Sequence, residues 1–196
     1  MNTTNDTIPA CHAGVDEAGR GPLAGPVVTA AVIPGQQLDL NGIRDSKKLT
    51  EKRRNEWFTR ILEQAAAHCI VVVSPAEIDE MNILQATLDG MRRAVEGLNI
   101  TPELVLVDGN KAPKIELPVQ TVVGGDDIHA AISAASVLAK VTRDRLMVAL
   151  DGEYPQYGFA KHKGYPTPQH LKALREHGAT PHHRQSFGPV KQLPLI

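Results

Sequence analysis

The order of strand-like and helix-like segments along the chain most constrains its fold. Two Val-rich apolar segments come first, at residues 13–18 and 27–33, and the Gly- and Pro-rich connection between them predicts a hairpin with a wide loop. The expected helices then cover residues 50–68, 74–98, 128–150 and 167–177, and the further strands cover residues 69–73, 104–107 and 119–123. This order predicts an α/β or α+β domain with a mixed sheet, in which residues 151–166 form the longest irregular segment.

The 196 residues suffice for one sizeable core, and 42% hydrophobic with 22% charged residues excludes collagen-like, disulfide-rich and wholly disordered classes. Cys11 and Cys69 have the spacing of neither a zinc site nor a disulfide framework, which favours a reducing compartment. Residues 1–10 lack the pattern of a signal peptide, and no apolar run approaches the roughly 18 residues of a membrane span. We therefore expect a soluble, cytoplasmic monomer.

Charge is unevenly distributed, although the chain as a whole carries a net charge of −1. Residues 1–160 contain 15 Lys and Arg against 21 Asp and Glu, whereas residues 161–196 contain 6 against 1. A near-neutral total argues against a nucleic-acid partner, because nucleic-acid-binding domains are commonly basic. The separation of charge nevertheless leaves a basic C-terminal part that suits phosphate contacts.

Carboxylates interrupt or follow three separate strand-like segments. Asp16 and Glu17 lie inside the first strand, Asp108 closes a later one, and Asp126 lies between a strand and the long helix. A carboxylate in an apolar strand is costly to bury unless it is paired or binds a metal. Adjacent strand residues point to opposite faces, so Asp16 and Glu17 serve one site only if the strand twists, bulges or ends there. Clustered carboxylates favour Mg²⁺ or Mn²⁺ and predict phosphoryl-transfer chemistry with two ions about 3.5 to 4 Å apart.

Each of these carboxylates also has a structural interpretation. The first acidic pair could lie on a solvated surface. Asp108 and Gly109 have the sequence of a turn. Asp126 or Asp127 could serve as the N-cap of the long helix. Taken one at a time, the last two positions favour these simpler interpretations, and only their combination favours a metal site.

A glycine-rich loop, residues 19–25, follows the first strand. It is similar to the dinucleotide-binding fingerprint of an oxidoreductase, but its third glycine is one position late, and Pro22 removes a backbone donor that a pyrophosphate would need. We favour a loop whose exposed backbone approaches a sugar edge and senses a 2′-hydroxyl.

Basic residues gather in two C-terminal motifs. Residues 161–167 combine lysines with Tyr165, which suits phosphate contacts and stacking on nucleic acid. Residues 182–184, His-His-Arg, favour a phosphate contact or an exposed surface over a metal site. The segment 45–48 is a further candidate phosphate contact. A solvated basic face with Tyr165 in the core remains the alternative, and a catalytically silent nucleic-acid-binding module would use the same residues.

Several motifs, in order, closely resemble bacterial ribonuclease HII over about residues 13–190. The motifs are VDEAGRGPLAGP at residues 15–26, DSKKL at 45–49, VDGN at 107–110, ISAAS at 132–136 with AKVTRD at 139–144, and HKGYPT at 162–167. The resemblance implies an α/β, ribonuclease H-like mixed β-sheet flanked by helices, with a C-terminal helical extension. It implies a flexible leader at residues 1–12, one catalytic domain at 13–190 whose basic helical part covers about 161–190, and a tail at 191–196.

The resemblance also implies Mg²⁺- or Mn²⁺-dependent cleavage of the RNA strand in RNA–DNA hybrids. A further implied activity is incision 5′ to a single ribonucleotide embedded in duplex DNA, by a two-ion mechanism that leaves a 3′-hydroxyl and a 5′-phosphate. The implied catalytic and metal-binding residues are Asp16, Glu17, Asp108 and Asp126. The expected nucleic-acid-binding residues are Gly19, Arg20, Gly21, Lys47, Lys163 and the junction-sensing Tyr165. Residues 124–127 read Gly-Gly-Asp-Asp where the family often has Lys-Gly, and we choose Asp126 because it directly follows the glycine.

The C-terminal residues 192–196 resemble the short Gln-Leu-x-Leu-Phe peptide that docks bacterial proteins on the replication sliding clamp. Apolar residues at a terminus invite a partner. Because such short motifs also match by chance, an end that is frayed or tucked onto its own core remains the alternative.

Overall fold

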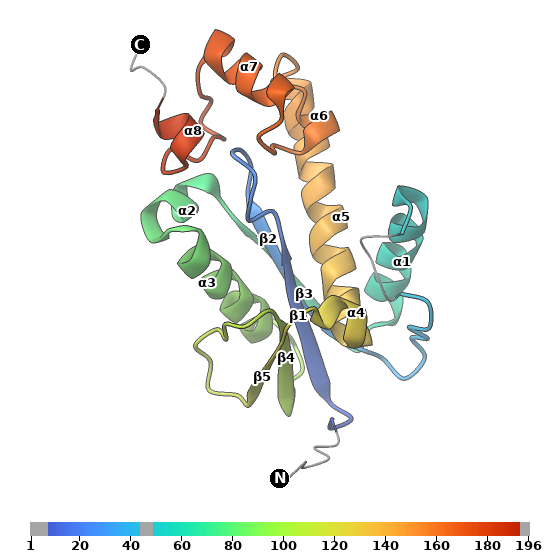
Figure 1. Ribbon diagram of the computed structural model, residues 1–196. Helices are drawn as coiled ribbons and strands as arrows, with labels where there is room; N and C mark the ends of the chain where they lie inside the picture. Colours follow the sequence, from blue (N-terminus) through green and yellow to red (C-terminus); the bar gives the residue numbers. More distant parts are fainter. Residues whose placement is uncertain (1–7, 44–48, 193–196) are drawn as a thin grey trace.

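The computed structural model describes residues 8–43 and 49–192, which form a five-stranded sheet with helices on both faces (Figure 1). The strands, in the spatial order β3-β2-β1-β4-β5, are β1 (His12–Ala18), β2 (Val27–Ile33), β3 (Ala67–Val73), β4 (Leu104–Asp108) and β5 (Val119–Val122). The helices are α1 (Glu51–Gln64), α2 (Pro75–Met81), α3 (Ile83–Glu96), α4 (Gly125–Ile128), α5 (Ala130–Glu153), α6 (Phe159–His162), α7 (Pro168–His177) and α8 (Gly188–Lys191).

Strand β1 lies at the centre of the sheet between an antiparallel and a parallel neighbour. It pairs antiparallel with β2, with Gly14 opposite Val32, and parallel with β4, with Val15 opposite Val107. The expected hairpin and mixed sheet are therefore confirmed. Because β1 and β4 run in the same direction, their carboxyl ends meet at one edge of the sheet, which is where sites of parallel sheets form.

Strand β2 shows how the sheet separates two layers of the core. Val28, Ala30 and Val32 pack with residues of α1 and α5, whereas Ala31 packs with residues of α3. Successive strand side chains point to opposite faces, so a strand covered on both sides needs apolar residues at nearly every position. Figure 1 shows α5 crossing one face of the sheet while α3 lies on the other.

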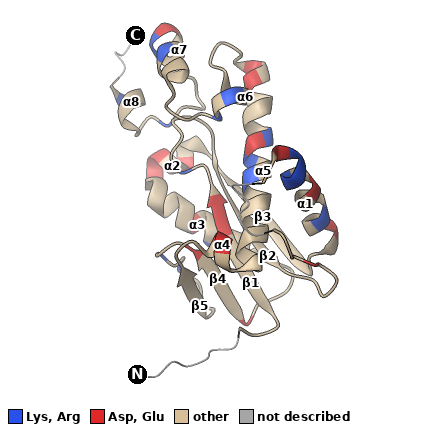
Figure 2. Ribbon diagram, turned by 45° about the vertical axis from the view of Figure 1, so that its right-hand side comes forward, with Lys and Arg blue, Asp and Glu red and all other residues tan. Residues whose placement is uncertain are grey.

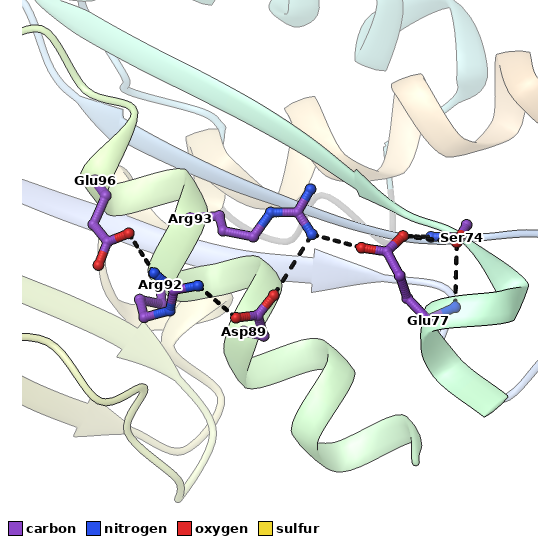
Figure 3. Close-up of polar contacts among 6 residues, drawn as sticks. All are labelled: Ser74, Glu77, Asp89, Arg92, Arg93 and Glu96. Carbon is purple, nitrogen blue, oxygen red and sulfur yellow. Dashed lines mark hydrogen bonds and ion pairs between the residues drawn. The ribbon is translucent and has the colours of Figure 1, made fainter. Parts of the chain in front are cut away.

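Helices α2 and α3 are fixed to each other by a capping box and ion pairs (Figure 3). The Glu77 carboxylate accepts hydrogen bonds from the amide and the hydroxyl of Ser74, both at 2.7 Å. Glu77 also accepts a hydrogen bond from Arg93 of α3 at 2.8 Å. Asp89 adds contacts with both Arg92 and Arg93. This network ties the start of α2 to the C-terminal half of α3.

Some helices and strands begin or end at other residues than the sequence predicted, because tertiary contacts determine their boundaries. Strand β3 begins at Ala67 instead of residue 69, because it pairs along the whole of β2. The helix expected at residues 128–150 is α5, which begins at Ala130 and continues to Glu153, and a short helix that was not expected, α4, precedes it. The segment 151–166 is not wholly irregular, since it contains α6. Within the described parts of the chain, no helix is both long and apolar enough to cross a membrane.

The C-terminal helices form a separate layer at one end of the molecule (Figure 1). Their core contains Tyr157, Phe159 and Leu174, which pack with Met147 of α5 and Leu23 of the loop after β1. This confirms the expected C-terminal helical extension and places it against the 19–26 loop, the segment between β1 and β2.

Candidate active site

Strands β1 and β4 bring three carboxylates to one end of the sheet. Val15 lies opposite Val107, so Asp16 and Asp108 follow on neighbouring parallel strands. Glu17 comes next, one residue before β1 ends. Figure 2 shows this acidic end of β1 in the middle of the molecule. The parallel pairing of β1 with β4 thus brings Asp16, Glu17 and Asp108 to the same end of the sheet, as predicted.

Asp16 is a buried carboxylate in an unfavourable electrostatic environment. It is 4% exposed, and its pKa is raised well above the ordinary value by burial first and then by the nearby charges of Glu17 and Asp108. A hydrogen bond with the Ser136 side chain opposes this increase. The Glu17 amide, which donates to Asp16 Oδ1 at 2.7 Å, does so too. Burial and like charges that together raise a pKa are typical of functional carboxylates.

Glu17 is only partly compensated by its surroundings. Arg20 Nη1 lies 3.4 Å from Oε1, whereas Oε2 is buried and has no hydrogen-bond partner among the described residues. Burial raises the pKa of Glu17, the charge of Arg20 opposes that increase, and the charge of Asp108 adds to it. A buried carboxylate oxygen without a donor is costly, so this position favours an additional positive ligand.

Helix α4 places the fourth predicted carboxylate. The Gly125 amide donates to Asp108 Oδ1 at 2.7 Å, which ties the start of α4 to the end of β4. Asp126 follows directly and is 2% exposed, whereas Asp127 is exposed. The N-cap of α4 is Gly124, with φ at 68°, and α5 is capped elsewhere, so the N-cap interpretation of the two aspartates is wrong. The sequence-based choice of Asp126 therefore coincides with the buried member of the pair.

Two clefts meet at Glu17. A cleft of about 390 Å³ lies between β1, α1, α5 and the C-terminal layer, and a second of about 270 Å³ lies between β1, β4 and α3. A larger hollow of about 810 Å³, between α3 and the β4–β5 connection, contains none of the predicted site residues. The residues that line the first cleft are Glu17, Ala18, Gly19, Arg54, Ser136, Lys140, Arg143 and Tyr165.

The carboxylates fit a hard divalent cation by their chemistry. Carboxylate oxygens are the ligands that Mg²⁺ and Mn²⁺ prefer. In the part of the chain that the structure describes, no three His, Cys, Asp or Glu side chains converge as a ready-made metal cage. A cation beside Asp16 and Glu17 would relieve their mutual repulsion and give Glu17 Oε2 a partner. The donor set therefore fits Mg²⁺ or Mn²⁺.

Two buried arginines hold the backbone of the 19–26 loop. Arg184 is 0% exposed and donates to the carbonyl oxygens of Gly19 and Arg20 at 2.6 and 2.8 Å, and to that of Gly25 at 3.0 Å. Arg143 is 1% exposed and donates to three further carbonyl oxygens, those of Ala24, Pro26 and Lys163. The loop that follows β1 is thus fixed by hydrogen bonds from charged donors, which are stronger than neutral ones.

Backbone carbonyls compensate these two charges. Burial lowers the pKa of Arg143 to about 10 and that of Arg184 to about 9, so both guanidinium groups stay charged near neutral pH. Among the described residues, neither forms an ion pair with a carboxylate. An added Cβ at Gly19 would lie 1.9 Å from Arg143 Nε, which explains why this position, with φ at 99°, is a glycine.

The expectation of a surface position for residues 182–184 is wrong for two of the three. His183 is 1% exposed, and Arg184 is fully buried. The cause is an antiparallel bridge between Ala24 and His183, reinforced by a 2.9 Å hydrogen bond from the Gly25 amide to His182 O. The bridge turns these side chains inward. Part of the C-terminal positive charge therefore faces the 19–26 loop and not the solvent.

The structure brings Tyr165 and the glycine loop together. Tyr165 is 46% exposed, so the interpretation that it belongs to the core is wrong. An added Cβ at Gly21 would lie 3.4 Å from Tyr165 Cε1, which places the ring beside the loop. The Lys163 side chain folds back to the carbonyl oxygen of Ala160. The remaining predicted contact, Lys47, lies outside the described residues.

Three α5 residues that line the first cleft were not predicted as site residues from the sequence. Ser136, Lys140 and Arg143 occur at positions i, i+4 and i+7, which lie on one face of a helix. That spacing, in an Ala-rich helix, was the available signal. For Arg184 no local signal exists, since its burial depends on a bridge to a segment about 160 residues away.

The chain matches known proteins over nearly all of its length. A family model described as Ribonuclease HII matches residues 13–190. Ribonuclease H2 from Pyrococcus horikoshii OT3 superimposes with a TM-score of 0.80 at 31% identity, covering 92% of this chain and 95% of that one. The ribonuclease HII of a PCNA:RNase HII complex from Archaeoglobus fulgidus gives a TM-score of 0.73 at 27% identity, covering 91% and 95%.

A more distant structure shares the fold. Bst-RNase HIII, in complex with Mn²⁺, gives a TM-score of 0.70 at 18% identity, covering 92% of this chain and 68% of that one. These structures confirm the ribonuclease H-like architecture. Since the family model also spans both the carboxylate strands and the C-terminal layer, the chain belongs to the ribonuclease HII family.

Proposed function

We propose that this ribonuclease cleaves the RNA strand of RNA–DNA hybrids and incises 5′ to single ribonucleotides embedded in duplex DNA. The products would carry a 3′-hydroxyl and a 5′-phosphate. Family membership supports the hydrolysis of RNA, and the motifs quoted above favour a bacterial member of the family. The observation that carries the finer proposal is a single cleft that joins Glu17, Gly19 and Tyr165.

Four carboxylates would hold two divalent ions in this account: Asp16, Glu17, Asp108 and Asp126. When bound, such ions activate a water and stabilise the leaving oxygen of the phosphodiester. Ser136 orients the Asp16 carboxylate through its hydrogen bond. The Gly125 amide fixes Asp108 in the same way. Arg20 holds Glu17 Oε1, and its side chain is 50% exposed, so it can also meet the substrate.

Recognition of the substrate would come from the opposite side of the cleft. The backbone of Gly19 and Gly21 would approach the ribose edge with its 2′-hydroxyl. Tyr165 would stack on the deoxyribose beyond the junction, as its exposed ring beside Gly21 allows. Lys47 would contact phosphates of the duplex, and Lys163 would do so once its ammonium leaves the carbonyl oxygen of Ala160.

A nicking assay tests the proposal directly. An end-labelled DNA duplex with one ribonucleotide is incubated with the protein and Mg²⁺ or Mn²⁺ in parallel. We expect one incision on the 5′ side of the ribonucleotide, a nick with a 3′-hydroxyl, and no product in EDTA. Binding without any nicking would instead identify a silent nucleic-acid-binding module.

Tyr165→Ala tests the recognition half of the proposal. We expect a loss of about tenfold or more on the single-ribonucleotide duplex, because base or sugar stacking contributes about 1–3 kcal/mol. Activity on a continuous RNA–DNA hybrid should fall much less. An equal loss on both substrates would contradict a junction-reading role.

A second proposal concerns the C-terminal tail. We propose that residues 192–196 dock on a sliding clamp, for which the PCNA:RNase HII complex from Archaeoglobus fulgidus gives support by analogy. Gln192 is exposed just after α8, whereas residues 193–196 lie outside the described part of the chain. Deletion of the last five residues should abolish clamp binding without changing nicking; unchanged binding would contradict the proposal.

A further inference from the structure

Three buried histidines lie together beneath the segment that carries Tyr165. His162, His170 and His183 are 9%, 0% and 1% exposed. The rings of His162 and His170 are stacked with centroids 4.6 Å apart, and His170 Nε2 lies 3.1 Å from His183 Nε2. The catalytic scheme above uses none of them. Because buried histidines are costly unless they are neutral and hydrogen-bonded, their hydrogen bonds indicate their role.

The hydrogen bonds fix the tautomer of each ring in the His183–His170 pair. The Thr180 amide donates to His183 Nδ1 at 2.9 Å, so the His183 proton is on Nε2. His183 Nε2–H therefore donates to His170 Nε2, which leaves the His170 proton on Nδ1. His170 Nδ1–H donates to the carbonyl oxygen of Tyr165 at 2.9 Å. The two histidines thus form a relay of hydrogen bonds in which His183 donates to His170, and His170 donates to the backbone of Tyr165.

The surroundings keep this relay neutral. Burial, together with the nearby ring of His170, lowers the pKa of His183 to about 4. Burial also lowers the pKa of His170, with a further decrease from the nearby ring of His162, against the opposing effect of the hydrogen bond to Tyr165 O. The other rings against the pair are Tyr157, Phe159 and the neighbouring histidines His162 and His182. A second proton on His170 would place two donors face to face at the Nε2–Nε2 contact. A second proton on His183 would lie on Nδ1, where it would face the Thr180 amide.

The relay also connects Tyr165 to the 19–26 loop. His183 forms the bridge with Ala24, and the Leu23 amide donates to Gly164 O at 2.8 Å, one residue before Tyr165. The Thr167 amide gives Tyr165 O its second donor, at 2.8 Å. The backbone of Tyr165 is thereby held from two sides relative to the loop that would meet the ribose.

We propose that His170 is a positioning residue that holds the Tyr165 backbone through its Nδ1–H, and that His183 sets the required His170 tautomer. This arrangement fixes the Tyr165 ring beside Gly21 and so determines the preference for ribonucleotide–deoxyribonucleotide junctions. The inference rests on the proposed function of Tyr165. It adds two residues that touch no substrate.

Two substitutions of His170 separate its two hydrogen bonds. Asparagine carries an amide nitrogen near the position of Nδ1, so His170→Asn keeps the donor to Tyr165 O and loses the link to His183. Glutamine reaches the position of Nε2, so His170→Gln keeps the link to His183 and loses the donor to Tyr165 O. His68→Gln, on an exposed position of β3, is the matched control.

The measured quantity is the ratio of kcat/KM on a single-ribonucleotide duplex to kcat/KM on a continuous RNA–DNA hybrid. This ratio does not depend on the fraction of folded protein, which cancels between the two substrates. We expect His170→Gln to lower the ratio about five- to tenfold, the effect of one hydrogen bond, and His170→Asn and His68→Gln to change it less than about twofold.

The outcomes distinguish this inference from the proposed function. An unchanged ratio in Tyr165→Ala would overturn the recognition role of Tyr165 and this inference with it. A lowered ratio in Tyr165→Ala but not in His170→Gln would overturn the inference alone. Equal losses in His170→Asn and His170→Gln, or a larger loss in His170→Asn, would also overturn it, because the donor to Tyr165 O would then not be the deciding contact.

Discussion

The carboxylate end of the sheet and the C-terminal layer both bury charged groups, but the C-terminal layer compensates them more completely with hydrogen bonds. At the sheet, burial and like charges raise the pKa of Asp16, and one buried oxygen of Glu17 has no hydrogen-bond partner among the described residues. In the C-terminal layer, Arg184 is fully buried, yet each of its three nitrogens donates to a backbone carbonyl.

This difference separates a reactive site from a positioning framework. A buried carboxylate whose charge is only partly compensated is stabilised when a cation binds beside it. In the metal-free protein the same carboxylate lowers the stability of the fold. A guanidinium whose three nitrogens all donate to backbone carbonyls is already compensated, and it fixes the segments that it binds. Substitutions in the two regions should therefore change different quantities.

The largest expected effect is on activity, from neutralising a carboxylate. Asp16→Asn and Asp108→Asn should each lower kcat by about a thousandfold or more, because each removes charge from the proposed divalent-ion site. The melting temperature should stay equal or rise, since the repulsion around Asp16 is relieved. Cleavage assays and thermal unfolding check the two effects.

The neighbouring residues Asp126 and Asp127 provide a matched control and test which of them is the fourth carboxylate of the site. Asp126→Asn should reduce activity strongly, whereas Asp127→Asn, at an exposed position, should leave it within about twofold. The reverse pattern would move the assignment to Asp127.

A large effect on stability is expected in the C-terminal layer. Arg184→Met should lower the free energy of unfolding by about 3 to 4 kcal/mol, because it leaves the carbonyls of Gly19, Arg20 and Gly25 without their donors. Arg175→Met, at an exposed arginine of α7, should change it by less than about 0.5 kcal/mol. Urea unfolding measures both, and equal values would contradict the role assigned to Arg184.

A smaller effect on the free energy of unfolding is expected from a change of pH. The pKa of His183 is lowered from 6.5 to about 4, so between these values the unfolded chain binds a proton that the native protein does not. Stability is therefore complete above the unfolded pKa and falls as the pH decreases, by about 2 kcal/mol from about pH 7 to about pH 5. The His183→Gln variant should lack this part of the pH dependence in urea unfolding; an identical slope in both proteins would contradict a neutral, buried His183.

Local patterns predicted most of the sheet and the first three carboxylates. Val-rich strands and their glycine flanks are visible in sequence, and the parallel register then brings Asp16 beside Asp108. Helix α4 was not predictable from the local sequence, because it is fixed by a hydrogen bond from the Gly125 amide to Asp108 of β4. The same holds for the early start of β3, which follows its pairing with β2.

The burial of His183 and Arg184 in the C-terminal layer could not be predicted from the sequence. His183 and Arg184 read as surface residues because charged and imidazole side chains are seldom fully buried. Their burial depends on the bridge to Ala24, a contact between distant segments. Lys163 could be placed near the site by its motif, but only the structure shows that its side chain folds back to Ala160.

The central claim is that the acidic end of β1 is poised for a cation. A carboxyl-detected NMR titration of Asp16, in the metal-free protein and with Mg²⁺ added, tests it most directly. We expect the pKa of Asp16 to lie well above the ordinary value without metal and to decrease clearly when Mg²⁺ is present. A pKa of Asp16 near that of a solvated aspartate, unchanged by Mg²⁺, would contradict it.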